Sequence, residues 1–180
     1  MQPGQEPILA GRVNGEHDRN RILAALSPIA LPTIVILEFR SVSLATASYL
    51  DEVTLRFRAK LRDASAYLVV ANLSAKVLEE FEHLLRRSGD AFLICDLSES
   101  GIASKPKVLG VLEPKLEETY KHVKTKGEAS ATELYVEFGN AEKVGPTAWN
   151  NRLNTLADKG LLMEIPLGRA KKYRPILEAM

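Results

Sequence analysis

The stretch AYLVVANLSAKVLEEFEHLLRRSGDAFLICDL, residues 66–97, decides the fold class. It contains an apolar run, a segment with apolar residues at helical spacing and a second apolar run, at 66–73, 75–88 and 91–97. In the middle segment Val77, Phe81 and Leu84 stand at i, i+4 and i+7, and Gly89 follows as a stop signal. Short apolar runs between turn residues indicate strands buried on both faces. The stretch therefore predicts strand, helix and strand.

The same alternation extends towards the N-terminus. TIVILEF (33–39) is another short apolar run, and the segment 48–63 between these runs has helical periodicity. Strands that alternate with helices indicate parallel neighbours joined by crossovers, hence an α/β layer. Ahead of this layer we expect a first strand near Ile8–Val13 and a short helix around Asp18–Leu26.

Composition is that of an ordinary globular protein. The chain has 180 residues, of which 46% are hydrophobic and 26% charged, with a net charge of +1, so any electrostatic partner must meet a local patch. The single cysteine, Cys95, is expected to be a buried small side chain in a reducing cytoplasm. No apolar run approaches the ~18 residues of a membrane span, and the N-terminus does not resemble a signal peptide. We therefore expect a cytoplasmic protein without a membrane partner.

The character of the sequence changes after Leu97. Residues 98–114 are rich in Gly, Pro and Ser, which predicts a linker, although Val108–Leu112 could add an edge strand. We therefore expect two domains, 1–112 and 113–180.

The C-terminal domain is predicted to contain three helices and then a hairpin. The first helix ends at Gly127, and the second begins with a Ser130–Glu133 capping box and is expected to end at Gly139. The third begins with Pro146 at its first position, and the segment around LGRAKK reads as the hairpin. This order is that of a small α+β domain of the winged-helix type.

The third helix has two different faces. At 100° per residue Trp149, Leu153 and Leu156 form an apolar stripe, and the opposite side carries polar residues: Thr147, Asn151, Asn154 and Asp158, with Asn150 at its flank. Asparagine is a poor helix former but can bond adenine bidentately in the major groove. The hairpin cations suit phosphate contact: Arg169, Lys171, Lys172 and Arg174. The alternative is a solvated polar face.

Residues 113–178 resemble the winged helix-turn-helix superfamily, through SATELYVEFG, GPTAWNNRLNTLADKGLL and MEIPLGRAKKYR. The resemblance implies a DNA-binding domain, with dimerisation if the target is palindromic. Residues 113–180 hold 11 Lys and Arg against 10 Asp and Glu, unlike strong DNA binders. The acids in or near the helix-turn-helix would repel phosphate if they faced it: Glu133, Glu137 and Glu142.

Residues 8–97 resemble the STAS fold of anti-sigma factor antagonists, and more closely the STAS-like bacterial domains of unknown function, through TIVILEFRSVSLATASYLDEV (33–53). The resemblance implies that Glu38 matches the acid at the strand end and Ser48 the phosphoacceptor. Thr46 replaces the family's loop aspartate and Tyr49 its glycine. Ser48 and Thr46 are therefore candidate regulatory residues.

Ser48 also has a structural interpretation. As the N-cap of the helix 48–63 its hydroxyl would accept from a first-turn N–H, with Asp51 completing a box-like arrangement.

No enzyme signature is present. His17, His83 and His122 are far apart in the sequence, and no phosphate-binding glycine motif occurs. We interpret GRVNGEHDRNR as a solvated turn before a helix, and the pairs Asp51–Glu52 and Glu79–Glu80 as surface residues. We therefore expect no catalytic site, metal or cofactor.

The leading hypothesis is a bacterial-type transcriptional regulator with a STAS-like sensing or protein-interaction domain and a DNA-binding winged helix. The alternative is a protein–protein interaction module of a partner-switch pathway, without DNA binding.

Overall fold

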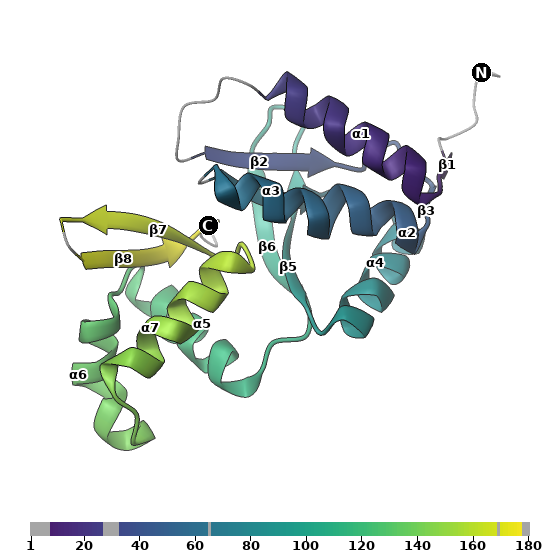
Figure 1. Ribbon diagram of the computed structural model, residues 1–180. Coiled ribbons are helices and arrows are strands. Elements are labelled where there is room, and N and C mark those ends of the chain that lie inside the picture. Colours follow the sequence, from purple (N-terminus) through teal and green to yellow (C-terminus); the bar gives the residue numbers. More distant parts are fainter. Residues whose placement is uncertain (1–7, 27–32, 65, 169, 178–180) are drawn as a thin grey trace. The chain divides into compact units, whose positions relative to one another are not determined.

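A computed structural model describes residues 8–26, 33–64, 66–168 and 170–177 (Figure 1). The chain divides into two compact units, Met1–Val111 and Leu112–Met180. The mixed α/β content predicted from the sequence is confirmed. None of the described helices is both long enough and apolar enough to span a bilayer.

The first unit alternates strands and helices. Its elements are β1 (Ile8–Leu9), α1 (Arg12–Ala25), β2 (Thr33–Glu38), β3 (Leu44–Ala45), α2 (Ala47–Leu50), the π-helical segment η1 (Asp51–Arg56), α3 (Phe57–Asp63), β4 (Ala66–Ala71), α4 (Ala75–Ser88), β5 (Ala91–Leu97) and β6 (Ala103–Gly110). The main sheet has the order β2-β4-β5-β6, and β1 pairs with β3. The first three strands of the sheet are mutually parallel, as their apolar runs predict.

The fourth strand lies where the sequence predicted mainly a linker. β6 pairs antiparallel with β5 from Ala91 opposite Gly110 to Leu97 opposite Ala103. Pro106 is tolerated because β6 is an edge strand, where a missing N–H need not break a ladder. The glycines and prolines of this segment therefore led to the prediction of a linker, and only the end of β6, within Val108–Leu112, was predicted as a possible edge strand.

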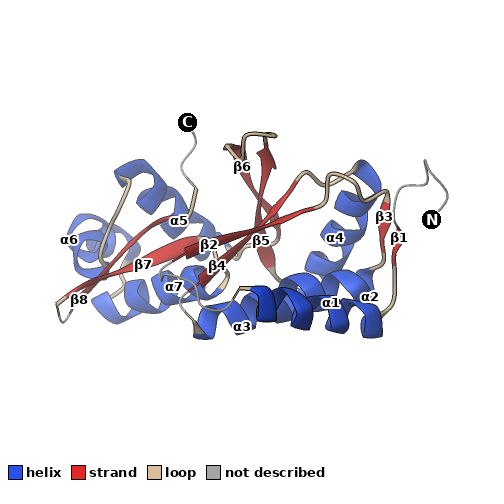
Figure 2. Ribbon diagram, turned by 90° about the horizontal axis from the view of Figure 1, so that it is seen from above, coloured by secondary structure: helices blue, strands red, loops and turns tan. Residues whose placement is uncertain are grey.

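One core joins the sheet to the helices of the first unit. Leu68 and Val70 of β4 and Phe92 of β5 pack with Phe57 and Phe81 from the helices, all of them buried. The rings of Phe81 and Phe92 meet edge to face, with centroids 5.4 Å apart. Figure 2 shows α1, α2 and α3 together on one side of the sheet.

The helix predicted at 48–63 starts one residue earlier and is capped differently. α2, η1 and α3 follow one another without a break, and Thr46, in an extended conformation, is the N-cap. Ser48 lies inside the first turn, so its predicted role as N-cap is wrong. Asp51 does not complete a capping arrangement either, because it is bound by Arg12 and Arg56.

The N-terminal predictions were also wrong in extent. β1 has two residues, and α1 begins at Arg12 instead of near Asp18. Gly11, with φ of 87°, ends the extended segment. Gly15 is the only buried residue of α1, so the helix lacks the apolar stripe that sequence periodicity detects.

The second unit has the predicted order of three helices and a hairpin. Its elements are α5 (Pro114–Lys126), α6 (Ala131–Glu142), α7 (Pro146–Asp158), β7 (Leu162–Leu167) and β8 (Ala170–Pro175). The capping box at Ser130 and Pro146 at the start of α7 are confirmed. α6 does not end at Gly139, which is buried within it beneath the ring of Tyr135. It continues to Glu142 and ends at Lys143 in the left-handed conformation.

The second unit has its own core. Trp149, Leu153 and Leu156 are fully buried, which confirms the predicted stripe of α7. They are joined in the core by Leu134 of α6 and Tyr173 of β8. Backbone hydrogen bonds in both directions between Ala129 and Tyr173, each 2.9 Å, tie the hairpin to the α5–α6 turn.

Candidate functional site

The outer face of α7 presents the exposed polar residues Thr147, Asn150 and Asn151, and the exposed Asp158 lies at its C-terminal end. The side chains of Thr147, Asn150 and Asn151 make no hydrogen bond to another described residue, and the Thr155 hydroxyl donates to the backbone carbonyl of Asn151. The helix begins at Gly145 without a side-chain cap, so the N–H groups of its first turn are not satisfied by a capping side chain. This face can offer amide donors and acceptors to an external molecule.

Asn154 is placed differently from the other asparagines. It is half-buried, and its Oδ1 accepts a hydrogen bond of 2.6 Å from the hydroxyl of Tyr173. The sequence placed Asn154 on the outward face, but the structure gives it a contact with β8. Its amide helps to fix the hairpin against α7.

The two hairpin lysines are bound to carboxylates. Lys171 Nζ lies 2.9 Å from Glu164, and Lys172 Nζ lies 2.9 Å from Glu128 and 3.3 Å from Glu133. Hydrogen bonds to Glu128 and then Glu133 raise the pKa of Lys172, which keeps it charged. The hairpin is therefore nearly neutral around these two lysines.

The other two predicted phosphate contacts are Arg174 and Arg169. Arg174 Nη2 lies 3.6 Å from Met163 Sδ. Arg169 lies outside the described residues.

The three acids expected to repel phosphate differ in how far they are exposed. Glu142 is nearly buried and binds Arg152 at 2.6 Å, so it does not face outward. Glu133 and Glu137 are about half exposed, and Glu137 binds Lys126 at 2.5 Å. Two of the three acids therefore remain at the surface of α6.

Sequence reasoning missed Lys143. It is exposed in the turn between α6 and α7 and makes no ion pair with another described residue. Because α6 was expected to end at Gly139, this lysine was not placed next to the start of α7. Its left-handed backbone, with φ of 55°, is uncommon outside glycine and gave no sequence signal.

In the first unit, the candidate regulatory residues lie side by side. The hydroxyls of Thr46 and Ser48 are 3.3 Å apart, and Thr46 Oγ1 also accepts from Gly11 N at 3.2 Å. Ser48 lines a pocket of about 350 Å³ together with Arg12, Arg87 and Ser88. Arg87 makes no ion pair with another described residue. Ser48 therefore shares this pocket with two arginines and with one acid, Asp51.

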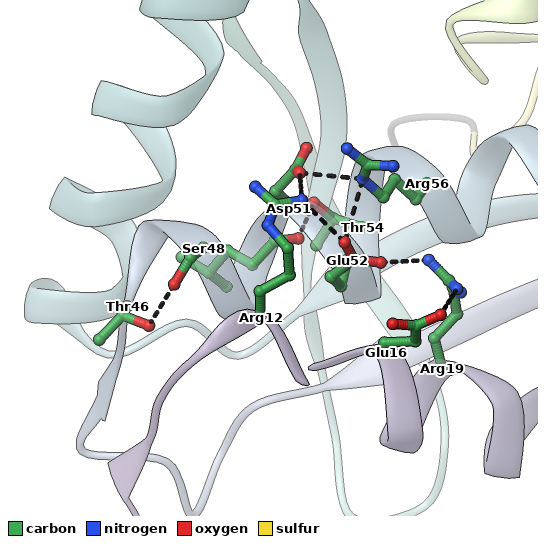
Figure 3. A network of polar contacts seen from close by, with 10 residues as sticks. Arg12, Glu16, Arg19, Thr46, Ser48, Asp51, Glu52, Thr54 and Arg56 are labelled. Atoms are coloured by element: carbon green, nitrogen blue, oxygen red, sulfur yellow. Dashed lines mark hydrogen bonds and ion pairs between the residues drawn. The ribbon is translucent and has the colours of Figure 1, made fainter. Parts of the chain in front are cut away.

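Next to this pocket lies an ionic network centred on the buried Glu52, shown in Figure 3. Only 4% of the Glu52 side chain is exposed, so interpreting it as a surface residue was wrong. Arg12 lies 2.8 Å and Arg56 3.1 Å from Glu52 Oε1, and Arg19 binds Oε2. Arg12 and Arg19 come from the segment expected to be a solvated turn. They instead fasten α1 to η1.

The acid at the end of β2 has a bridging role. Glu38 Oε1 accepts from Arg40 Nε at 2.7 Å and from Asn72 Nδ2 at 2.6 Å, and these hydrogen bonds lower the pKa of Glu38. The Asn72 side chain also bonds the backbone N–H and carbonyl of Leu97, so it links the ends of β2, β4 and β5.

No protein-family model matches the chain, and no curated protein or solved structure matches it either. The structure by itself establishes a chain of two compact units with mixed α/β content.

Proposed function

We propose that the protein is a transcriptional regulator whose second unit is a winged helix that binds duplex DNA through α7. The observation that carries the proposal is the free amide face of α7, with Thr147, Asn150 and Asn151 exposed opposite the buried Trp149 stripe. Amide side chains at the N-terminal half of such a helix suit the N6 and N7 atoms of adenine.

Phosphate contacts would come from Lys143 and from the hairpin lysines Lys171 and Lys172. Exposed ion pairs contribute only about 0–1 kcal/mol, so a phosphate can replace a carboxylate at these lysines. Each replacement leaves a carboxylate nearby, which reduces the gain. We therefore expect weak non-specific binding and a strong dependence on the α7 face.

The first unit would be the STAS-like domain that receives a signal or a protein partner. Ser48, Thr46 and the neighbouring pocket form its candidate regulatory site, where a phosphorylated Ser48 would meet Arg12 and Arg87. Mass spectrometry of native protein, together with a Ser48→Glu variant, tests this part. Unmodified Ser48 and unchanged behaviour of the variant would remove it.

A gel shift against genomic fragments tests DNA binding, at low salt and at about 0.2 M salt. Asn151→Ala should lower the preference for the contacted base by about 1–3 kcal/mol. Lys143→Ala should weaken binding to all sequences alike and reduce the salt slope by about one. Lys60→Ala, which removes an exposed charge from the first unit, is the control. A folded protein that binds no fragment at either salt concentration rules out the proposal.

The second candidate function is docking of a protein partner without DNA. It is favoured by the neutralised hairpin and by exposed apolar residues of the second unit: Tyr135, Val136 and Leu167. Val136, which is 76% exposed in the middle of α6, is the clearest of these. Failure of the gel shift, with loss of a partner interaction in Val136→Asp but not in Asn151→Ala, would select this function.

A homodimer is expected only with a palindromic DNA target. Sedimentation of the protein with and without its DNA fragment tests this point.

A further inference from the structure

Three potential metal ligands meet at the junction of α5 and α6. Glu118 and His122 lie one turn apart on α5, and Glu142 is the last residue of α6. One oxygen of each carboxylate and one His122 ring nitrogen lie within 4.8 Å of one another. This cluster could not be predicted from sequence spacing, because Glu142 lies 20 residues beyond the histidine.

Glu142 shows that this cluster is incomplete. Its side chain is only 8% exposed, and its two oxygens differ in their hydrogen-bond partners. Oε2 accepts from Arg152 at 2.6 Å and from Lys115 at 3.4 Å. Oε1 is buried and has no hydrogen-bond partner among the described residues. A buried carboxylate oxygen without a partner is costly, so this oxygen is available to a ligand from outside the chain.

The His122 ring is held in one plane. It stacks on Phe138 with ring centroids 3.8 Å apart and an interplanar angle of 19°, and the Trp149 ring meets it at 6.1 Å. Stacking occupies the face of the imidazole, whereas metals bind the nitrogens at its edge. The ring is therefore oriented without using its ligand atoms.

We propose that Glu118, His122 and Glu142 bind a divalent transition-metal ion, with Zn²⁺ as the reference case. The imidazole favours zinc or a neighbouring first-row metal over Mg²⁺ or Ca²⁺, which prefer oxygen ligands. One imidazole nitrogen, one oxygen of Glu118 and Oε1 of Glu142 are three ligands, and water can take the fourth position. The site would fasten α5 to α6. The inference goes beyond the proposed function, because it does not depend on DNA binding.

Lys115 is the competitor for this site. Its ammonium lies 3.2 Å from Glu118 and 3.4 Å from Glu142, and its side chain is 58% exposed. The ion pair with Lys115 accounts for a contact of Glu142 Oε2, but it leaves Glu142 Oε1 without a hydrogen-bond partner among the described residues. The metal would displace Lys115 into solvent, while Arg152 keeps its bond to Oε2.

The test uses chelator-treated full-length protein titrated with Co²⁺, followed by competition with Zn²⁺. We expect one equivalent to bind, with a visible Co²⁺ absorption band and quenching of Trp149 fluorescence. Trp149 is the only tryptophan in the chain, and its ring lies 6.1 Å from the His122 ring, so a metal bound at His122 is close enough to quench it. His122→Ala should weaken binding at least about tenfold, since it removes a direct ligand. His83→Ala, at an exposed position on α4, should bind as the unchanged protein does.

Lys115→Ala is a second variant that leaves all three ligands in place. It should bind Co²⁺ more tightly, because the competing ammonium is gone. Absence of saturable binding by the unchanged protein would overturn the proposal. Equal affinities of His122→Ala and His83→Ala, or no gain in Lys115→Ala, would overturn the assigned site.

Discussion

Gly15 shows how a single residue sets the distance between two helices. A Cβ atom at this position would lie 2.9 Å from the Glu52 Cβ and 2.9 Å from the Tyr49 carbonyl oxygen. The backbone of α1 therefore rests directly on the start of the neighbouring helical segment. This close approach brings the arginines of α1 within reach of Glu52.

Gly15→Ala is expected to destabilise the first unit by about 1–3 kcal/mol, because the added methyl group forces α1 away from η1. Urea unfolding measures the change. Asn20→Ala, at an exposed position on the same helix, is the control and should have little effect. Equal stability of the two variants would show that α1 is not packed as closely as described.

Glu52→Gln keeps the shape of the side chain and removes its charge. Breaking a fully buried ion pair costs about 3–5 kcal/mol, but Arg12 and Arg56 remain half exposed here, so we expect about 2–3 kcal/mol. Arg19, only 12% exposed, accounts for most of that loss. The control is Glu82→Gln, which breaks an exposed pair with Arg86. Thermal unfolding that ranks the two variants alike would contradict the buried network.

The sequence could not reveal this network. Glu52 stands beside Asp51 in a charged stretch, and its partners Arg12 and Arg19 are separated from it by 40 and 33 residues. Adjacent carboxylates on a helix usually point to solvent, and only the fold decides which of them turns inward. The same limit applies to Glu142, which helical periodicity alone did not place in the interior.

At the scale of elements, the bounds of a helix were predicted correctly where its apolar periodicity and its end signals agreed. α4 was predicted with its bounds, because an apolar stripe and a terminal glycine pointed to the same helix, and Gly89 adopts the left-handed conformation. α1 was misplaced because Arg12 and Arg19 attach it through ion pairs, and its apolar contacts with the core come from Ile22 and Leu23 near its end, which form no helical period. α6 was cut short because Gly139 reads as a stop, although it is a packing contact with Tyr135.

The capping box of α6 makes the second unit sensitive to acid. The hydrogen bond from the Ser130 N–H lowers the pKa of Glu133 below its ordinary value of 4.5. A carboxyl whose pKa is lower in the folded state contributes stability above its unfolded pKa and loses it as the pH falls through the folded pKa. The box should therefore weaken as the pH falls below about 4.5.

Ser130→Ala removes one half of this box. It should cost about 1 kcal/mol at neutral pH and reduce the loss of stability at low pH only in part, because the backbone N–H of residue 130 still donates to Glu133. Denaturant unfolding followed by Trp149 fluorescence at several pH values measures both effects. Thr132→Ala, in the same turn and exposed, is the control. If the stability of Ser130→Ala depends on pH in the same way as that of the control, the capping box is not the cause of the acid sensitivity.

At the scale of the whole molecule, each unit has its own balance of apolar and ionic contacts. The first unit combines a conventional sheet-and-helix core with a helix attached by arginines. The second unit buries Trp149 and Tyr173 and neutralises its hairpin lysines with its own carboxylates. The alternation of strands and helices could be predicted from the sequence, because buried strands appear as apolar runs and the packed helices have apolar residues at helical spacing. The pairing of surface charges could not be predicted, although it determines the net charge beside the α7 face.

The separate core of the second unit leads to a prediction about the isolated segment 112–180. We expect it to fold by itself and to unfold cooperatively, with a stability of about 3–5 kcal/mol, as befits a core of this size. Trp149 emission should be blue-shifted without denaturant and should shift to the red in one transition. Leu153→Ala opens a cavity beside Trp149 and should cost about 2–5 kcal/mol, enough to unfold the segment. A segment that already shows exposed Trp149 emission in buffer would mean that its core needs the rest of the chain.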